Sequence, residues 1–138
     1  MAGTLRTMDY GIQDIIKRRI GEVTAGICTT WQTEGTVEWL DSIPPVVNNP
    51  DMQKLVAEAG KNILGEEYVI ESYKAAMSCE DVAHFMARVP GLFALINTSN
   101  DNPETWNSWH SPTLKIAEEV LWHGTALHVQ TVADYLAE

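Results

Sequence analysis

Apolar residues recur at every third or fourth position between residues 11 and 28. This is the period of an amphipathic helix, and the basic run 17–19 falls on its polar side. Asp9 stands at the position expected for the N-cap. A short strand is predicted before this helix, over 3–8, and a second over 36–40, where apolar and polar residues alternate. The stripe of the predicted helix consists of Ile12, Ile15, Ile16, Ile20, Val23 and Ile27.

A strand, a helix and a strand within about 40 residues make half of a split β-α-β sandwich. Such a half is too small to cover both faces of its own sheet. We therefore expect its open sheet edge and its uncovered face to need a partner segment.

A second region follows the segment 41–50, in which two consecutive prolines exclude a helix and stiffen the chain. Asn49 and Pro50 then supply an N-cap and a first helical residue. The apolar stripe that follows is helical in period, and Gly65 is expected to end this helix.

The pattern beyond residue 65 predicts five further elements. The predicted fold class is α/β: an α+β piece followed by an α/β piece, with partial mixed sheets and packed helices. The elements are a strand over 68–70, a helix over 80–89 capped by Ser78, a strand buried on both faces over 92–96, a polar loop over 97–111 and a long helix over 116–136.

Composition narrows the function classes. The chain has 138 residues, 45% of them hydrophobic, and can bury a core, but its net charge of −10 argues against nucleic-acid binding and against an anionic membrane surface. No apolar run approaches the ~20 residues of a membrane span, and the first residues lack the apolar core of a secretion signal. Only two cysteines are present, and we expect a cytoplasmic protein.

Common catalytic motifs, such as glycine-rich phosphate loops and HExxH, do not occur. Glu80 and His84 lie four residues apart on a predicted helix, so their side chains can meet. Two interpretations stay open: an imidazole oriented by an acid near a metal, or a surface histidine paired with a helix-start acid. Cys79 is expected to be a small buried residue.

His110 follows the predicted buried strand and precedes a Ser-Pro pair. Loops at strand ends present catalytic groups, so His110 is a candidate site residue, with a structural histidine as the alternative. Trp106 and Trp109 could form pocket walls beside it. His123 and His128 are expected to be ordinary helix residues, because five residues separate them and they do not share a helix face.

Five segments in order carry a resemblance to a known family: GTLRT, IPPVVNNPDM, MSCEDVAHFMARVPG, WHSPTLKIAEEVL and the long last helix. The chain resembles the C-terminal part of the metal-dependent aminoacylase/carboxypeptidase family, in the branch of hippurate hydrolase and the indole-acetyl–amino acid hydrolases. The resemblance implies that residues 1–42 are the last strand-helix-strand of a lid or dimerisation domain. Residues 43–138 would then be the C-terminal part of the catalytic domain.

The same resemblance assigns roles to individual residues. His110 matches a metal ligand, and Glu80 with Asp81 matches an acidic pair that supports the site. Arg6 matches the arginine of a family strand and is expected to contact substrate, with a structural ion pair as the alternative. Trp109 is expected to contact substrate as a pocket wall beside His110. The family uses a pair of divalent ions, zinc or manganese, to activate water. One histidine cannot hold such a pair, so the missing N-terminal part would complete the site.

Three hypotheses follow. In the first, the chain is part of a hydrolase that cleaves amide bonds of N-acyl-amino acids or related small amides; it is inactive alone and is completed by a separate N-terminal polypeptide. In the second, it is a non-catalytic remnant that acts as a standalone or homo-oligomeric interaction domain. In the third, it is a small binding module that uses the loop with Trp106, Trp109 and His110. Whether the chain is itself an enzyme stays open.

Overall fold

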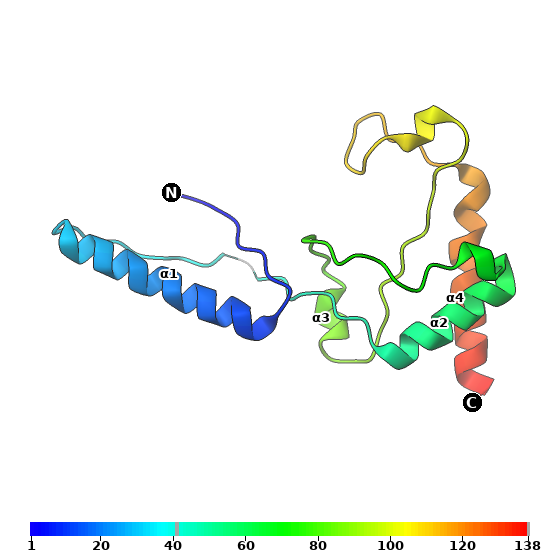
Figure 1. Ribbon diagram of the computed structural model, residues 1–138, viewed down its shortest axis with the longest axis horizontal. Helices are drawn as coiled ribbons and strands as arrows, with labels where there is room; N and C mark the ends of the chain where they lie inside the picture. Colours follow the sequence, from blue (N-terminus) through cyan, green and yellow to red (C-terminus); the bar gives the residue numbers. More distant parts are fainter. Residues whose placement is uncertain (41, 138) are drawn as a thin grey trace. The chain divides into compact units, whose positions relative to one another are not determined.

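The computed structural model describes residues 1–40 and 42–137 (Figure 1). Asp41, which begins the predicted connector, lies outside the described residues. The chain divides into two compact units. Unit 1 comprises 1–47 and 74–90, and unit 2 comprises 48–73 and 91–138.

Unit 1 is built on helix α1, Tyr10–Thr30. Its N-cap is Asp9, whose carboxylate accepts a hydrogen bond from the Ile12 amide at 2.8 Å. The helix predicted from the isoleucine spacing is therefore confirmed, together with its cap. After Trp31 the backbone of Gln32 takes a positive φ of 52°, and the chain turns back.

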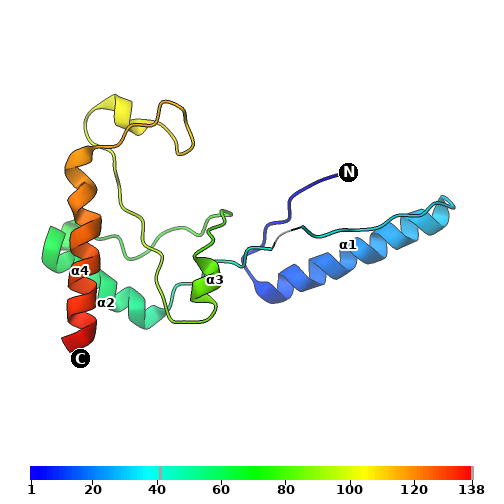
Figure 2. The ribbon, with the colours of Figure 1, turned by 180° about the vertical axis from the view of Figure 1, so that it is seen from behind.

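The segment 33–40 returns along α1, as both ribbon views show (Figures 1 and 2). At Gly35 a Cβ atom would lie only 2.7 Å from the Cys28 sulfur, so the segment passes close to the helix because glycine has no side chain. Nearer the start of the helix, the Lys17 ammonium lies 5.5 Å from the centre of the Trp39 ring. Side-chain contacts hold this segment in place.

The predicted α/β fold class is wrong for the residues that the structure describes. The segments 3–8, 36–40, 68–70 and 92–96 were all predicted as strands, and none of them is one. A strand exists only through hydrogen bonds to a neighbouring strand. In a split β-α-β unit the two strands do not pair with each other, because another strand lies between them. No described segment occupies that place.

Helix α3, Ala83–Met86, is a single turn where a longer helix was predicted over 80–89. Ser78 does not cap it; Val82 stands at the N-cap and makes no side-chain cap bond. The amides of Ala83 and His84 donate to carbonyls three residues back, at 3.1 and 3.0 Å. Such turns are tighter than an α-helix and rarely extend far, which explains the short element.

Unit 2 contains helix α2, Pro50–Leu64, as the sequence predicts. The Asn49 side chain accepts hydrogen bonds from the amides of Asp51 and Met52, at 3.0 and 3.1 Å. Gly65 ends the helix with a φ of 102°, a value that favours glycine. Cap, first-turn proline and terminal glycine are all confirmed.

The segment after α2 is tied back to that helix. It begins with the 3₁₀ turn η1, Glu66–Tyr68. Lys61 pairs with Glu58 on its own helix and with Glu71 beyond the turn, both at 2.8 Å. Hydrogen bonds to these two carboxylates raise the pKa of Lys61 above its ordinary value, and the bond to Glu58 has the larger effect.

Helix α4, Leu121–Ala137, follows the 3₁₀ turn η3, Glu118–Val120. The long last helix is therefore present but starts later than the predicted residue 116. Helix α2 crosses α4 (Figures 1 and 2). Gly60 lies at this contact: a Cβ there would be 3.2 Å from a Val69 methyl and 3.8 Å from a Leu127 methyl.

The buried positions are occupied by small residues. Among the described residues, no large side chain is fully buried. The core is therefore formed by small side chains, next to which backbone segments lie close together, and not by large interdigitating side chains. The buried residues are Ala57, Ala59, Gly60, Thr105 and Ala117 in unit 2 and Ala83 in unit 1.

Helix α1 buries none of its residues. Its apolar stripe stays open to solvent, with Ile12, Val23 and Ile27 each about half exposed. No described helix combines the length with the apolar content that crossing a bilayer requires.

Candidate functional site

The loop that carries the candidate histidine is built on a short 3₁₀ turn, η2, Pro103–Trp106. Asn102 caps this turn by accepting a hydrogen bond from the Glu104 amide at 3.1 Å. At the base of the loop, the Ala117 amide donates to the Thr98 carbonyl at 2.9 Å. The two ends of the segment 98–117 are thus joined.

Thr105 is the buried centre of this loop. Its hydroxyl donates to the Asn102 carbonyl at 2.8 Å and accepts from the Asn100 amide at 3.1 Å. The Trp106 indole N–H donates to the Asn100 carbonyl at 2.7 Å. In this loop, polar side chains make the hydrogen bonds to backbone amides and carbonyls that a strand ladder or a helix would make elsewhere. These bonds fix the course of the backbone.

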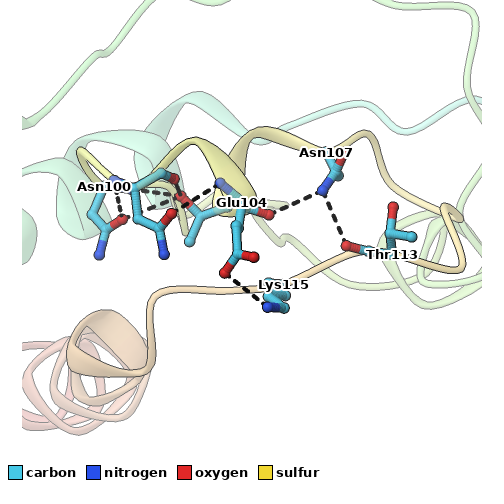
Figure 3. Close-up of polar contacts among 7 residues, drawn as sticks. Asn100, Glu104, Asn107, Thr113 and Lys115 are labelled. Atoms are coloured by element: carbon cyan, nitrogen blue, oxygen red, sulfur yellow. Dashed lines mark hydrogen bonds and ion pairs between the residues drawn. The ribbon is translucent and has the colours of Figure 1, made fainter.

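Asn107 joins η2 to the far side of the loop (Figure 3). Its side-chain amide donates to the Glu104 carbonyl at 3.0 Å and to the Thr113 carbonyl at 3.1 Å. Beside it, the Lys115 ammonium pairs with the Glu104 carboxylate at 2.8 Å. The hydrogen bond and charge of Lys115 hold the pKa of Glu104 below its ordinary value.

His110 lies in the turn that these contacts enclose. The Ser111 amide donates to the Ser108 carbonyl at 3.1 Å, and His110 has a φ of 65°. A positive φ at the third residue is the requirement of a type II turn. Residues other than glycine adopt it rarely, although histidine is enriched among them. His110 is exposed, and Trp109 before it is 62% exposed.

The structure brings Trp109 and His110 together in one turn of unit 2. Glu80, Asp81 and Arg6 belong to unit 1. Glu80 is half-buried, and Asp81 is exposed. That these three residues share a site with His110 stays a prediction.

Arg6 lines an open cavity of about 380 Å³ within unit 1. The neighbouring Thr7 hydroxyl is buried and has no hydrogen-bond partner among the described residues. The cavity is mainly apolar, which suits an apolar group more than a charged one. Its lining consists of Arg6, Thr7, Met8, Asp9, Ile12, Ile16 and Met77.

Two local expectations differ from the structure. No ion pair joins Glu80 to His84 in the part of the chain that is described; the short turn there is closed by backbone bonds instead. Cys79 is exposed, whereas a buried position was expected. Both differences follow from the missing first turns of the helix predicted over 80–89.

A metal ion needs several converging donors. Over residues 1–40 and 42–137, no group of three or more His, Cys, Asp or Glu side chains is placed to hold one. Two carboxylates of the His110 loop region are already engaged: Glu104 with Lys115, and Glu119 with the Asn100 amide at 2.6 Å, a bond that lowers the pKa of Glu119. These residues offer one imidazole and not a complete metal site.

The residues that shape the loop were not singled out from the sequence. A signal was present, because Asn102-Pro103-Glu104 has the same Asn-Pro-acid order as 49–51, which correctly predicted the start of α2. Asparagine also occurs at 97, 100 and 107. Asparagine favours turns because its side chain bonds to nearby backbone.

Comparison with known proteins decides the family. The sequence description of peptidase family M20/M25/M40 matches residues 4–134. The chain belongs to this family. Its members are generally metal-dependent, and the resemblance noted from the five sequence segments is confirmed. None of the solved structures gives a significant match to this M20-family chain.

The chain is similar to three curated proteins whose names denote hydrolases. It is 30% identical to IAA-amino acid hydrolase ILR1-like 2 of Arabidopsis thaliana, over 100% of this chain and 31% of that protein. It is 29% identical to the putative amidohydrolase YhaA of Bacillus subtilis, over 88% of this chain and 30% of the relative. It is also 29% identical to N-acetyl-L-cysteine deacetylase of the same bacterium, over 86% and 27%. The chain thus spans about a third or less of the relatives it matches.

Proposed function

We propose that this M20-family chain forms part of a metal-dependent hydrolase that cleaves the amide bond of N-acyl-amino acids or related small amides. His110 supplies one ligand to a divalent ion, zinc or manganese. The other ligands come from the portion of the relatives' length that this chain does not span. Alone, the chain is inactive in this proposal, since one imidazole cannot hold a catalytic metal.

The observation that carries the proposal is the exposed His110 held at a positive φ in a hydrogen-bonded turn of an M20-family chain. Unusual backbone conformations persist only where the surroundings enforce them, and they cluster at functional sites. The names of two relatives specify an amino acid conjugate and an N-acetylated amino acid, which supports the substrate class.

The remaining assignments belong to the same proposal. Glu80 and Asp81 support the metal site, and Arg6 and Trp109 contact substrate. Residues 1–42 act as the end of a lid or dimerisation domain, and residues 43–138 as the end of a catalytic domain. The completed enzyme works in the cytoplasm.

The test is metal content and amidase activity of the purified chain, alone and co-expressed with the sequence encoded upstream of it. We expect Zn²⁺ or Mn²⁺ to bind weakly to the chain alone and tightly to the complex, with hydrolysis of an N-acetyl-amino acid only in the complex. His110→Ala should abolish tight binding. His128→Ala, an exposed histidine of α4, is the matched control. Tight binding retained in the His110→Ala complex would refute the ligand assignment.

A second candidate function is that of a non-catalytic remnant that acts as a standalone or homo-oligomeric interaction domain. The open isoleucine stripe of α1 favours it, because an apolar helix face gains free energy when it leaves water. Sedimentation of the purified chain tests this candidate. Association that Ile20→Glu weakens, and that Arg18→Glu on the polar side does not, would support it. A monomer at all concentrations would exclude self-association.

A further inference from the structure

Asn107 makes two contacts that only its amide nitrogen can make. Its Nδ2 atom lies 3.0 Å from the Glu104 carbonyl oxygen and 3.1 Å from the Thr113 carbonyl oxygen. Both partners are acceptors without a proton, so the side chain must act as a double donor. A carboxylate of the same shape has no proton to donate at neutral pH and would repel both carbonyls.

These two bonds connect points on either side of the histidine turn. Glu104 belongs to η2, which the Asn102 cap and the buried Thr105 hydroxyl hold in place. Thr113 follows the turn, and its amide donates to the Ser111 hydroxyl at 3.2 Å. The bond from Asn107 to Thr113, drawn in Figure 3, therefore closes the segment 107–113 into a ring. His110 belongs to this segment.

The backbone of His110 needs such a constraint. A positive φ costs free energy for a residue with a Cβ, so an unconstrained loop would return to negative φ. The backbone bond between the Ser111 amide and the Ser108 carbonyl closes only the turn itself. The bridge from Asn107 fixes the ends of the segment from which this turn projects.

We infer that Asn107 is a positioning residue: its side-chain amide clamps the loop and holds the His110 imidazole in the orientation in which it meets a metal ion. This inference rests on the proposed function for the role of the imidazole. The clamp itself is a property of this chain and can be tested without a metal. In this inference Asn107 acts through the backbone of the loop, by way of its bonds to the Glu104 and Thr113 carbonyls.

Asn107→Asp is the direct test, because it removes both donors and keeps the size of the side chain. Asn97→Asp is the matched control: within the described part of the chain, the Asn97 side chain accepts a hydrogen bond from the Ser99 amide at 3.0 Å and donates none, and a carboxylate accepts equally well. Lys115→Gln breaks the neighbouring ion pair and leaves both Asn107 bonds possible.

The first measurement is NMR of the full chain without metal. The Leu114 amide donates to the Ser111 carbonyl at 3.1 Å. In Asn107→Asp we expect the amides of Ser111 and Leu114 to exchange about tenfold faster, which corresponds to the loss of one or two hydrogen bonds. The His110 amide-to-Hα coupling should move away from the value for a positive φ. Asn97→Asp should change neither, and Lys115→Gln should change them less. Exchange and coupling unchanged in Asn107→Asp would overturn the inference.

The second measurement separates positioning from stability and from the proposed function. In the co-expressed complex, Asn107→Asp should weaken Zn²⁺ binding by about tenfold while the thermal midpoint of the protein stays within the range of the Asn97→Asp control. If His110→Ala abolishes Zn²⁺ binding and Asn107→Asp leaves it intact, this inference fails and the proposed function stands. If His110→Ala has no effect, the proposed function fails, while the NMR result still decides whether the clamp exists.

Discussion

Helix α1 is regular over 21 residues and buries none of them, whereas the segment 98–117 has little regular structure and is tied together throughout. The helix satisfies its own backbone and offers an open apolar stripe. The loop satisfies its backbone with the side chains of Asn100, Asn102, Thr105 and Asn107. In this chain, a regular backbone and a backbone held in place by side-chain contacts are thus separate properties.

The difference has a functional lesson. Most of the stability of a helix in a protein comes from packing its apolar face against other segments. Helix α1 buries none of its residues and therefore lacks this contribution. The loop is held by hydrogen bonds among its own residues. An uncovered apolar helix face is therefore a feature of unit 1, while the hydrogen bonds on either side of His110 lie within unit 2.

The largest stability effect is expected at Gly60, where α2 and α4 meet. Gly60→Val should destabilise unit 2 by roughly 1–3 kcal/mol, because the added methyls meet Val69 and Leu127 in a buried position. Urea unfolding followed by circular dichroism measures the change. Gly21→Val in α1, where nothing lies within 4 Å, is the control and should show no overpacking penalty. Equal losses in both variants would contradict the α2–α4 contact.

Removing a helix cap should have the next largest effect. Asn49→Ala should destabilise α2 by about 1 kcal/mol, because the amides of Asp51 and Met52 lose their acceptor. Asp9→Ala removes the equivalent cap of α1. If α1 is uncovered, Asp9→Ala should lower helix content without moving the unfolding midpoint of unit 2. A shift of that midpoint would break the distinction between the two regions.

A smaller gain is expected when a glycine inside α1 is replaced. Gly26→Ala should raise the stability of this helix by about 0.5–1 kcal/mol, since alanine loses less backbone entropy and meets nothing within 4 Å. Circular dichroism of the full chain measures the added helix content. No gain would mean that α1 is limited by its missing cover and not by its sequence.

The smallest effect concerns pH. The pKa of Glu104 is lowered in the fold by Lys115, so the stabilising contribution of this pair is present above the ordinary value of 4.5 and is lost as the pH falls below it. Both side chains are well exposed, so the loss should be slight. The protection of the loop amides, taken relative to their intrinsic exchange rate at each pH, should fall modestly below this pH and not in Lys115→Gln, which lacks the pair. An identical pH response in the variant would assign the effect elsewhere.

The sequence was most informative where the signal is local. Asp9, Asn49 and Gly65 mark helix ends through bonds to residues within four positions, and all three predictions are confirmed. The three- and four-residue spacing of the apolar stripe likewise predicted helix α1 correctly. Such signals need no knowledge of the remaining fold.

Predictions that depend on distant partners were wrong or remain untested. The segments 36–40 and 92–96 have the composition of strands, but a strand requires a neighbour, and no described segment provides one. His110 was singled out correctly as a loop residue, yet its positive φ could not be read from its neighbours in sequence. In our inference that φ is tied to Asn107, whose hydrogen-bond partners lie three positions before it and six positions after it, on either side of the turn.

The small residues at the buried positions have a calorimetric consequence. The heat capacity of unfolding scales with the apolar surface that unfolding uncovers. Ala57, Ala59 and Ala117 take the buried places where larger side chains usually lie. The heat-capacity increment on melting this polypeptide on its own should therefore be well below the typical ~12–15 cal/mol/K per residue. We therefore expect a flat stability curve, in which the free energy of unfolding changes little with temperature.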